Sequence, residues 1–474
     1  SAWSSSSGTT GSGVKVGFIT LGCDKNTVDT ERYLAELSDY GGEFTRDLEI
    51  ADVIIVNTCG FIDAAKKESI DAMIEAARYK SDGACRAVVG VGCMIERHKA
   101  ELIEALPEVD LFLGASESGR LAQELAERGI VGADPVAMHP GVRIYTGDLP
   151  HVRYLKISEG CDHGCAFCAI PLMRGKHRSF ALGEVIREAQ LLEMQGAKEV
   201  NLVAQDLAHY GRDIRDGVKL PELLESLVAE TSIPWIRMLY LYSTGITPRL
   251  LEVVAREPRI LPYLDMPMQH ASDTVLARMR RPERKRTIRD RVARFRDAVH
   301  GVAIRTTCIV GFPGETDQDF DELLEFLEET QFDRVGAFTY SPQEGTHAAG
   351  MIDDVPEPVK RERLERLTEL QRSITADRYE SRLGTASRVL VDRVDESGRT
   401  VGRLPWQADD VDGVTYLDEQ VTPGEFADVA VEEVVDDYDF SATVVRRLES
   451  VAPRPIARIG RSLPMAATIG SYGR

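Results

Sequence analysis

Three cysteines near the start of the central third of the chain have the spacing of a metal or iron–sulfur site. The stretch CDHGCAFC places Cys161, Cys165 and Cys168 at C-x3-C-x2-C spacing. Three thiolates this close along the chain can converge on one inorganic centre. A closed site of this kind normally takes four protein ligands. The motif therefore leaves the fourth ligand to be found.

A zinc site would take that fourth ligand from a nearby histidine. His163 stands between the first two cysteines and would be strained in reaching the same metal, so His177 is the better zinc candidate. Both histidines are also consistent with exposed loop residues. The sharper hypothesis is a four-iron cluster that is held by three thiolates, with one iron left without a protein ligand.

Three further cysteines, Cys23, Cys59 and Cys93, follow apolar runs in the first quarter of the chain. The runs are VKVGFITLGC, ADVIIVNTCGF and RAVVGVGCM, and they are typical of buried parallel strands. Neighbouring strands lie about 4.8 Å apart, so their carboxyl ends would bring the three thiols together. Any one of them alone would fit a small buried core residue. Their shared position favours a second metal site.

The elements that position this second trio predict a doubly wound α/β domain over 14–140. A fourth strand is expected at VDLFLGAS, and helices are expected at 27–40 and 63–80. Ligands of such domains bind beyond the carboxyl ends of the strands, and the cysteines lie at that edge.

A second alternation of strands and helices fills 147–380. Strands are expected at HVRYLKIS, KEVNLVAQD, WIRMLYL, YLDMPMQ, AIRTTCIVGF and DRVGAFTYS, and Thr316 with Asp319 resembles a capping box at the start of a helix. Six such units are too few to close an eight-stranded barrel. The pattern therefore predicts an open, partial (β/α)6 barrel with its site at the carboxyl ends of the strands, where CDHGCAFC falls.

The pattern changes after a charged helix at 359–384. Short β-type runs with turns predict a small antiparallel β-barrel over 383–450. Residues 385–449 hold 16 acidic and six basic residues, a net charge of −10. The ends of the chain, 1–13 and 451–474, are expected to be a flexible tail and a disordered tail.

Composition narrows the class of protein further. The net charge of −20 argues against a broad nucleic-acid-binding face. Eight cysteines in 474 residues are too few for a disulfide scaffold and fit a reducing compartment, so we expect a cytoplasmic protein. No apolar run reaches the roughly 18 residues of a membrane span. We expect a monomer.

The CDHGCAFC motif resembles that of the radical S-adenosylmethionine enzymes. Phe167 precedes the last cysteine, and TTCIVGFPGET at 306–316 is similar to the glycine-containing strand end that lies along the cofactor in that superfamily. The resemblance implies that the cofactor chelates the open iron and is cleaved to a 5'-deoxyadenosyl radical. Such a radical reaches C–H bonds that acid or base cannot activate.

Both cysteine trios and the small terminal barrel together resemble the methylthiotransferases over about residues 14–450. The resemblance implies an auxiliary 4Fe-4S cluster on Cys23, Cys59 and Cys93, besides the radical-generating 4Fe-4S cluster on Cys161, Cys165 and Cys168. It also implies S-adenosylmethionine as both radical source and methyl donor, and a TRAM-like terminal barrel. The chemistry requires a reductant and a sulfur donor, neither of which the sequence names.

Two stretches, GCDHGCAFCAIPLMRGKHRSF and YLDMPMQHASDTVLARMRRP, are similar to the RimO-type branch of that family. The implied reaction is methylthiolation of the β-carbon of an aspartate in small-subunit ribosomal protein twelve. A basic ribosomal protein, or the ribosome, would suit the acidic terminal barrel. The alternatives are a transfer-RNA adenosine methylthiotransferase and a non-catalytic iron–sulfur or zinc binding module.

Further candidate residues lie near these motifs. Arg174 and Lys176 could hold a carboxylate of substrate or cofactor, or be ordinary surface charges. Cys85 and Cys308 fit free thiols. The residues expected to contact the cofactor or substrate are Phe167, Gln205, Asp206, Gln269, Gly311 and Gly314, with loop capping as the alternative for the three polar ones and a tight loop for the glycines.

Overall fold

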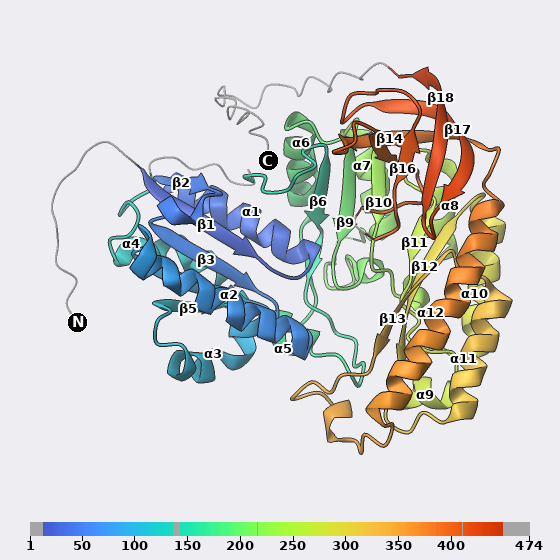
Figure 1. Ribbon diagram of the computed structural model, residues 1–474, viewed down its shortest axis with the longest axis horizontal. Coiled ribbons are helices and arrows are strands. Elements are labelled where there is room, and N and C mark those ends of the chain that lie inside the picture. The colour runs from blue at the N-terminus through green and yellow to red at the C-terminus, as the bar shows by residue number, and fades with distance from the viewer. Residues whose placement is uncertain (1–12, 136–142, 216, 410, 449–474) are drawn as a thin grey trace.

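The computed structural model describes residues 13–135, 143–215, 217–409 and 411–448. Figure 1 shows an N-terminal α/β domain beside a larger central domain, with a small β-barrel packed on one end of the central domain. The two expected tails lie outside the described residues, apart from Gly13. None of the described helices combines the length and the apolar character that a membrane span needs.

The N-terminal domain is a parallel five-stranded sheet with the order β2-β1-β3-β4-β5. Helices cover both faces, and two separate groups of buried apolar side chains fill the two layers. The strands are β1 (Val14–Thr20), β2 (Gly42–Thr45), β3 (Val53–Thr58), β4 (Ala87–Gly92) and β5 (Leu111–Gly114), and the helices are α1 (Asp24–Asp39), α2 (Asp63–Asp82), α3 (Cys93–Ala105) and α4 (Leu121–Glu127).

The expectation of a doubly wound α/β domain is confirmed, with one strand more than the apolar runs indicated. Strand β2 is four residues long, lies at the edge of the sheet, and has no fully buried residue. It therefore lacks the apolar run that marks a central parallel strand. Its pairing with β1, from Val14–Gly42 to Gly17–Thr45, is a property of the tertiary structure.

The central domain contains the six expected parallel strands as two three-stranded sheets, β6-β9-β10 and β11-β12-β13. A single parallel bridge between Ile236 and Ile260 links them. The result is an open, partial barrel around the largest group of buried side chains, with helices outside. The strands are β6 (Val152–Lys156), β9 (Glu199–Val203), β10 (Trp235–Met238), β11 (Tyr263–Asp265), β12 (Ala303–Val310) and β13 (Arg334–Thr339).

The outer layer of the central domain is helical, and a short antiparallel hairpin of β7 (Ser158–Glu159) and β8 (Arg178–Ser179) frames the CDHGCAFC loop. At the start of α11, Thr316 Oγ1 accepts from the backbone N of Asp319, whose carboxylate accepts in return from the backbone N of Thr316, so the capping box is present. The helices are α5 (Ile170–Arg174), α6 (Leu182–Met194), α7 (Leu220–Glu230), α8 (Pro248–Arg256), α9 (Asp273–Arg278), α10 (Lys285–Ala298), α11 (Asp317–Thr330) and α12 (Glu357–Glu380).

The terminal domain is a closed barrel in the order β14-β15-β16-β18-β17. The antiparallel pairing that the sequence predicts is confirmed for four of the five strand pairs, whereas β16 and β18 run parallel. A parallel pair joins two segments that are far apart along the chain. The alternation of apolar and polar residues within each strand does not indicate which strand will be its neighbour. The strands are β14 (Ala386–Val394), β15 (Thr400–Arg403), β16 (Thr415–Leu417), β17 (Phe426–Val435) and β18 (Asp439–Arg447).

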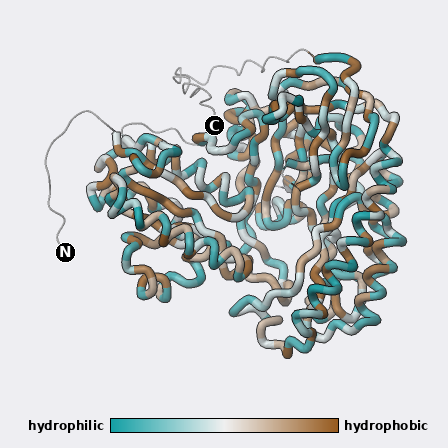
Figure 2. The backbone as a smooth tube through the Cα atoms, in the orientation of Figure 1, coloured by the Kyte–Doolittle hydropathy of each residue, from teal (hydrophilic) through white to brown (hydrophobic). Residues whose placement is uncertain are grey.

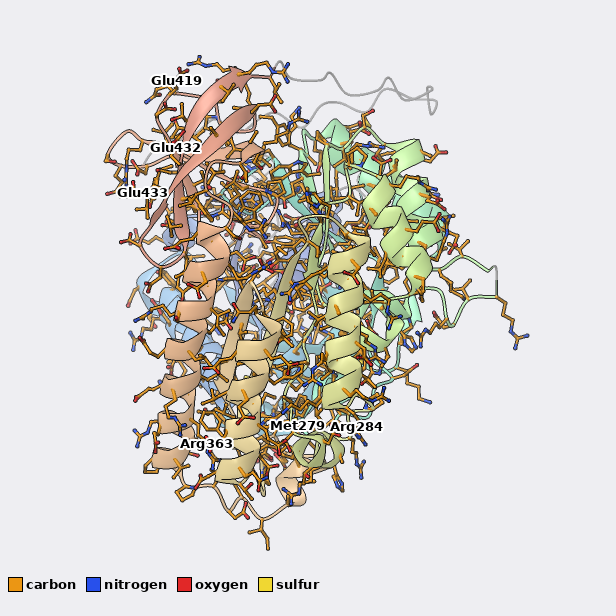
Figure 3. The ribbon with its side chains drawn as sticks, turned by 90° about the vertical axis from the view of Figure 1, so that its right-hand side faces the viewer. Met279, Arg284, Arg363, Glu419, Glu432 and Glu433 are labelled. Carbon is orange, nitrogen blue, oxygen red and sulfur yellow. The ribbon has the colours of Figure 1, made fainter. Side chains whose placement is uncertain are left out.

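The barrel packs against the first residues of the central strands. The Trp235 ring meets the Phe426 ring edge-on at 5.2 Å, and the Tyr263 hydroxyl donates to Asp412. In Figure 2 the strands are largely brown and the outer helices mix in far more teal, as expected for apolar strands between solvated helices. Figure 3 shows Glu419, Glu432 and Glu433 on the barrel, at the opposite end of the molecule from Met279 and Arg363.

Candidate active site

All six cysteines of the two trios line one cavity of about 460 Å³. The cavity lies between the N-terminal sheet and the carboxyl ends of the central strands, which contribute Gln205 after β9, Tyr240 after β10 and Gln269 after β11. Two cysteine trios that belong to different domains and span residues 23–93 and 161–168 therefore share one cavity. The expectation that both sites lie at carboxyl strand ends agrees with this geometry.

The N-terminal trio is held by the starts of helices and by a serine. Cys23 is the N-cap of α1, and Cys93 is the first residue of α3. Gly92, with φ of 101°, makes the turn into α3, since a Cβ there would lie 2.5 Å from Asn57 Oδ1. Cys59 directly follows β3, and its backbone N donates to Ser69 Oγ at 3.0 Å. The three strand ends thus present their thiols on one edge.

The central trio lies on the loop between β7 and α5. The backbone N of Cys161 donates to Gly175 O at 3.1 Å, and the backbone N of Cys168 donates to Cys165 O at 3.2 Å. Between them, the backbone N of Ala166 donates to Met279 O at 2.9 Å, which ties the loop to α9. Backbone bonds, and not side-chain packing alone, therefore set the shape of the loop.

Burial makes three of these thiols, Cys93, Cys161 and Cys168, poor thiolates in the absence of a metal. It raises the pKa of Cys93 and of Cys161 to about 11 and that of Cys168 to about 12. Neighbouring thiolates of the same trio raise all three pKa values further. A bound cation reverses this balance, because a coordinating thiol is deprotonated. Two trios of adjacent thiols, of which Cys93 is buried, Cys23 is exposed and the other four are half-buried, are a donor set that fits metal or iron–sulfur centres.

An arginine lies against each trio. Arg174, at the end of α5, donates from Nε to Cys93 Sγ at 3.0 Å, so a residue of the central domain reaches a cysteine of the N-terminal domain. Arg281 donates from Nη1 to Cys165 Sγ at 3.6 Å and stacks on the Tyr242 ring at 3.9 Å from its centroid. Positive charge beside a thiolate stabilises the ionised sulfur.

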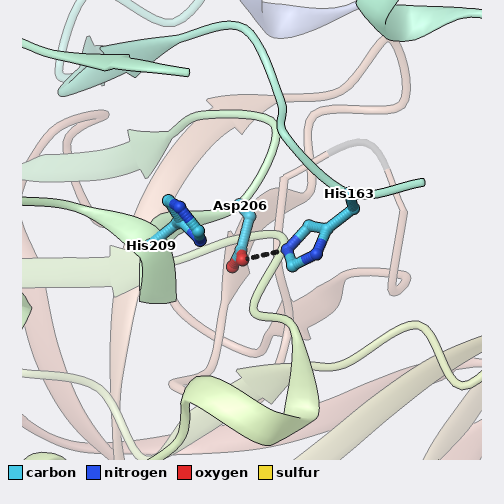
Figure 4. Close-up of side chains that lie close together, drawn as sticks. All are labelled: His163, Asp206 and His209. Carbon is cyan, nitrogen blue, oxygen red and sulfur yellow. Dashed lines mark hydrogen bonds and ion pairs between the residues drawn. The ribbon is translucent and has the colours of Figure 1, made fainter. Parts of the chain in front are cut away.

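The histidines near the central trio have other partners. His163 Nε2 bonds Asp206 Oδ2 at 2.8 Å (Figure 4), and the His163 ring stacks on the Tyr242 ring with centroids 3.9 Å apart. His177 Nε2 bonds Ser179 Oγ at 3.0 Å, and the His177 side chain does not line the cavity. Neither geometry supports the zinc alternative, in which one of these rings completes the cysteine site.

His163, Asp206 and His209 do form a group whose potential ligand atoms all lie within 4.8 Å of one another (Figure 4). Asp206 already accepts from His163, from the backbone N of Ala208 at 2.9 Å and from the backbone N of Tyr242 at 3.0 Å. These bonds fix the position of the loop after β9 and of the ring on which Arg281 stacks. They account for Asp206 as a loop-capping residue.

The structure brings three of the six predicted contact residues into the cavity. Phe167, Gln205 and Gln269 line it, and Gln205 is oriented by a bond from Nε2 to Glu159 Oε1 at 2.6 Å. Asp206 is not part of the cavity lining. Its carboxylate instead accepts hydrogen bonds from the backbone of Ala208 and Tyr242.

The two predicted glycines also lie outside the lining. Gly311 packs on the Lys360 side chain, which a Cβ there would meet at 2.3 Å, and Gly314 packs on Arg278. Both residues have positive φ, so the geometry corresponds to the tight-loop alternative.

Of the remaining residues that the sequence singled out, Arg174 lines the cavity, whereas Lys176, Cys85 and Cys308 do not. Four of the five N–H donors of Arg174 are already used, because besides the bond to Cys93 it donates to Asp29 at 2.7 Å, to Glu159 at 3.2 Å and to Asn26, and its charge is paired with two carboxylates. It is therefore not free to hold a substrate carboxylate. Lys176 is exposed and lies outside the lining. The thiols of Cys85 and Cys308 are buried away from the cavity, in the N-terminal core and in β12.

Several cavity residues carried no signal in the sequence. Tyr240, Tyr242 and Arg281 come from segments far from either cysteine motif, and only the fold brings them there. Lys25 and Asn26 lie two and three residues after Cys23 and could have been found by that proximity. Asn26 Oδ1 accepts from Arg174 and lies 4.0 Å from Cys93 Sγ, so it belongs to the surroundings of the N-terminal trio.

Comparisons with known proteins match each part of this architecture. The uncharacterized protein family UPF0004 matches residues 15–114, the radical SAM superfamily matches residues 155–327, and the TRAM domain matches residues 383–445. Two structures of the radical S-adenosylmethionine methyltransferase TsrM from Kitasatospora setae share the fold at 13% identity. Their TM-scores are 0.51 and 0.52, over 70% and 68% of this chain and 74% and 72% of theirs. Fold and site define a radical S-adenosylmethionine enzyme with a TRAM domain.

Curated relatives narrow this class to one family. "Ribosomal protein uS12 methylthiotransferase RimO" of Anaeromyxobacter sp. (strain Fw109-5) is 44% identical over 444 residues, which cover 92% of this chain and 94% of that protein. The proteins of the same name from Geotalea uraniireducens and Desulforudis audaxviator are each 42% identical, over 91% and 92% of this chain and 98% of their own length. The chain belongs to the RimO methylthiotransferase family.

Proposed function

We propose that this protein replaces a β-carbon hydrogen of an aspartate in ribosomal protein uS12 with a methylthio group. One observation carries the proposal beyond family membership. Both cysteine trios open onto the same cavity, so a substrate side chain in it is within reach of both centres. An electron-transfer or structural role would need no shared cavity, which argues against the non-catalytic binding module.

We assign a 4Fe-4S cluster to Cys161, Cys165 and Cys168 and a second, auxiliary 4Fe-4S cluster to Cys23, Cys59 and Cys93. When bound, the first cluster and S-adenosylmethionine supply a carbon radical that can remove hydrogen from an unactivated C–H bond. S-adenosylmethionine is also the proposed methyl donor. Each trio leaves one cluster position without a cysteine, and the lining residues Phe167, Gln205 and Gln269 are the proposed contacts of cofactor or substrate.

The rest of the lining would protect this chemistry. Its apolar part consists of Phe61, Ile62, Ala65, Phe167, Ile170, Met173, Leu241 and Pro267. These side chains exclude water from a site where a reactive radical must meet only its substrate. Arg174 and Arg281 would stabilise the thiolates of the two clusters through charge-assisted bonds.

The charge of the terminal barrel supports a basic protein, and not an RNA, as substrate. Of the six arginines in 385–449, Arg393 alone has no ion pair among the described residues; Arg388, Arg399, Arg403, Arg446 and Arg447 each meet a carboxylate. Glu419, Glu432 and Glu433 are exposed. RNA binding needs free cations for its phosphates, so the transfer-RNA alternative is disfavoured, whereas an acidic domain steers a basic partner.

We propose three functional units, 14–140, 147–380 and 383–450, which act together in the cytoplasm on uS12, free or within the ribosome. The first two units form the cavity, and the third contacts the amino ends of the central strands. The barrel would therefore attract the substrate from a distance without entering the site.

Mass spectrometry of uS12 tests the proposal. The chain with both clusters reconstituted is incubated anaerobically with uS12, S-adenosylmethionine, a reductant and sulfide. We expect a methylthio group on one aspartate and stoichiometric 5'-deoxyadenosine. Methylthioadenosine in co-incubated transfer RNA, with unmodified uS12, would contradict the proposal. Cys85→Ala is the matched control, since its thiol lies outside the cavity.

A further inference from the structure

Lys25 is a buried cation that lines the cavity. The residue is 8% exposed, and its Nζ lies 3.4 Å from the centroid of the Tyr240 ring. No carboxylate oxygen of the described residues lies within 4.0 Å of Nζ. A buried ammonium normally has an anionic partner, because burying an unpaired charge is costly. A ring face offsets only part of that cost.

The other cations of the lining are already neutralised. Arg174 meets Asp29 and Glu159 at 2.7 and 3.2 Å. Arg281 meets Glu283 Oε1 at 3.3 Å and donates to Pro267 O at 2.7 Å. Within the described lining, Lys25 is therefore the positive side chain with capacity for an added anion.

Tyr240 holds Lys25 in this place. Its backbone has φ of 66°, a conformation that is costly for a residue with a Cβ. Its backbone N donates to Asp265 Oδ2 and its hydroxyl to Asp24 Oδ2, both at 3.3 Å. These two hydrogen bonds hold the Tyr240 ring against the Lys25 ammonium, and the Tyr240 backbone keeps its positive φ at an energetic cost.

We propose that Lys25 binds the side-chain carboxylate of the substrate aspartate and so selects aspartate over uncharged residues. The inference rests on the proposed function, which brings an aspartate into an otherwise apolar cavity. A carboxylate leaving water for such a cavity needs a counter-charge, and Lys25 supplies one.

The position of Lys25 also fits the atom that reacts. Lys25 is two residues from Cys23, in the first turn of α1. The carboxylate carbon of aspartate is bonded directly to the β-carbon. A carboxylate held by Lys25 therefore brings the β-carbon beside the N-terminal trio, to which we assign the sulfur.

Binding without turnover tests this inference. The reconstituted holoenzyme, without reductant, is titrated with labelled uS12 and with uS12 in which the modified aspartate is changed to Asn. We expect the wild type to prefer the Asp form by about tenfold, as a hydrogen-bonded charge pair would give. Lys25→Met should bind both forms equally, and Lys25→Arg should restore the preference.

Two controls separate this role from a general effect. Lys176→Met removes an exposed cation near the site and should keep the tenfold preference. Lys25→Met should keep the iron content and the affinity for S-adenosylmethionine of the wild type.

Three other outcomes of the titrations would contradict the inference about Lys25 or the proposed function. An unchanged Asp preference in Lys25→Met overturns the inference while leaving the proposed function standing. A loss of S-adenosylmethionine affinity with an unchanged preference overturns it too, because Lys25 would then serve the carboxylate of the cofactor. No binding of uS12 by any variant overturns the proposed function itself, and with it this inference.

Discussion

Arg174 Nε donates a hydrogen bond to Cys93 Sγ at 3.0 Å, across the boundary between the central and N-terminal domains. Arg174 ends the short helix that follows the central trio, and Cys93 belongs to the other trio. The same guanidinium pairs with Asp29 of α1 and with Glu159 of β7. The Arg174 side chain therefore links the two cysteine motifs directly and brings a positive charge to the N-terminal trio.

Replacing Arg174 should change the redox properties of the N-terminal cluster. Arg174→Gln keeps a donor but removes the charge, so the reduced, more negative cluster loses stabilisation. We expect its reduction potential to fall by about 60 mV, the equivalent of about 1.4 kcal/mol for one electron. Potentiometric titration followed by electron paramagnetic resonance measures the shift. Arg281→Gln is the matched variant and should lower the potential of the central cluster instead; equal shifts of both clusters in either variant would argue against this assignment.

Asp29 should make the domain contact sensitive to acid. Burial raises the pKa of Asp29, but Lys156 and Arg174 outweigh burial and lower it to about 2. The folded pKa lies below the unfolded one, so the contribution to stability, about 2 kcal/mol, is full above about pH 4 and disappears as the pH falls toward 2. The melting temperature of the wild type should exceed that of Asp29→Asn at pH 5, and the gap should close near pH 2.

An exposed pair on α2 is the control for Asp29. Asp71→Asn removes the partner of Lys67, whose side chain is 79% exposed, so it should lower the melting temperature little at any pH. A gap for Asp29→Asn that stays constant from pH 5 to pH 2 would show that its carboxylate charge does not stabilise the fold.

The barrel should depend on a buried arginine. Arg403 donates to Asp392 at 2.7 Å within the barrel and meets Glu199 of β9 at 2.7 Å, and Glu199 also accepts from Arg237 at 2.7 Å. Arg403→Met leaves two buried carboxylates short of a partner, at a cost of about 3–5 kcal/mol. A lower melting temperature and faster proteolysis between α12 and β14 would show this loss of stability. Arg399→Met, which breaks an exposed pair with Asp395, should cost about 1 kcal/mol or less.

Substitutions of Gln269 should affect the stability of the fold and the affinity for S-adenosylmethionine in different ways. Its φ is 74°, and its backbone N and O bond to Thr307 and Ile309 of β12, each at 2.8 Å. Gln269→Gly and Gln269→Ala remove the same cavity side chain, but glycine alone adopts this φ without strain. We expect the Gly variant to be about 1 kcal/mol more stable than the Ala variant. Both should bind S-adenosylmethionine more weakly than the wild type in equilibrium titration; wild-type affinity in both would remove Gln269 from the proposed contacts.

The two trios should separate the two halves of the reaction. Cys161→Ala should abolish 5'-deoxyadenosine formation. Cys59→Ala should retain it while abolishing the methylthio product, and each variant should bind about four irons in place of about eight. Iron analysis and chromatography of the nucleoside measure these outcomes. Methylthiolated uS12 from Cys59→Ala would remove the N-terminal trio from the sulfur-handling role.

Much of the fold followed from patterns that are local in the sequence. The apolar runs that become β3, β4, β5, β9, β10 and β11 are buried at every residue, so each is continuous along the chain and easy to recognise. The edge strand β2 and the parallel pair β16–β18 were not predictable in this way. The first has no buried face, and the second is defined by a partner more than 20 residues away.

The sequence by itself determined the six cysteines, because the C-x3-C-x2-C spacing and the repeated position after parallel strands are properties of the chain order. Only the tertiary structure decided that both trios open into one cavity and that Arg174 pairs with Asp29 and Glu159 and bonds Cys93. It also decided that Lys25 lies over the Tyr240 ring with no carboxylate of the described residues beside it. The physical reason is that pairing of charges depends on distances of a few ångströms between segments far apart in the sequence. The packing of the two domains therefore determines that Arg174 and Arg281 pair with carboxylates and that Lys25 remains available to bind an anion.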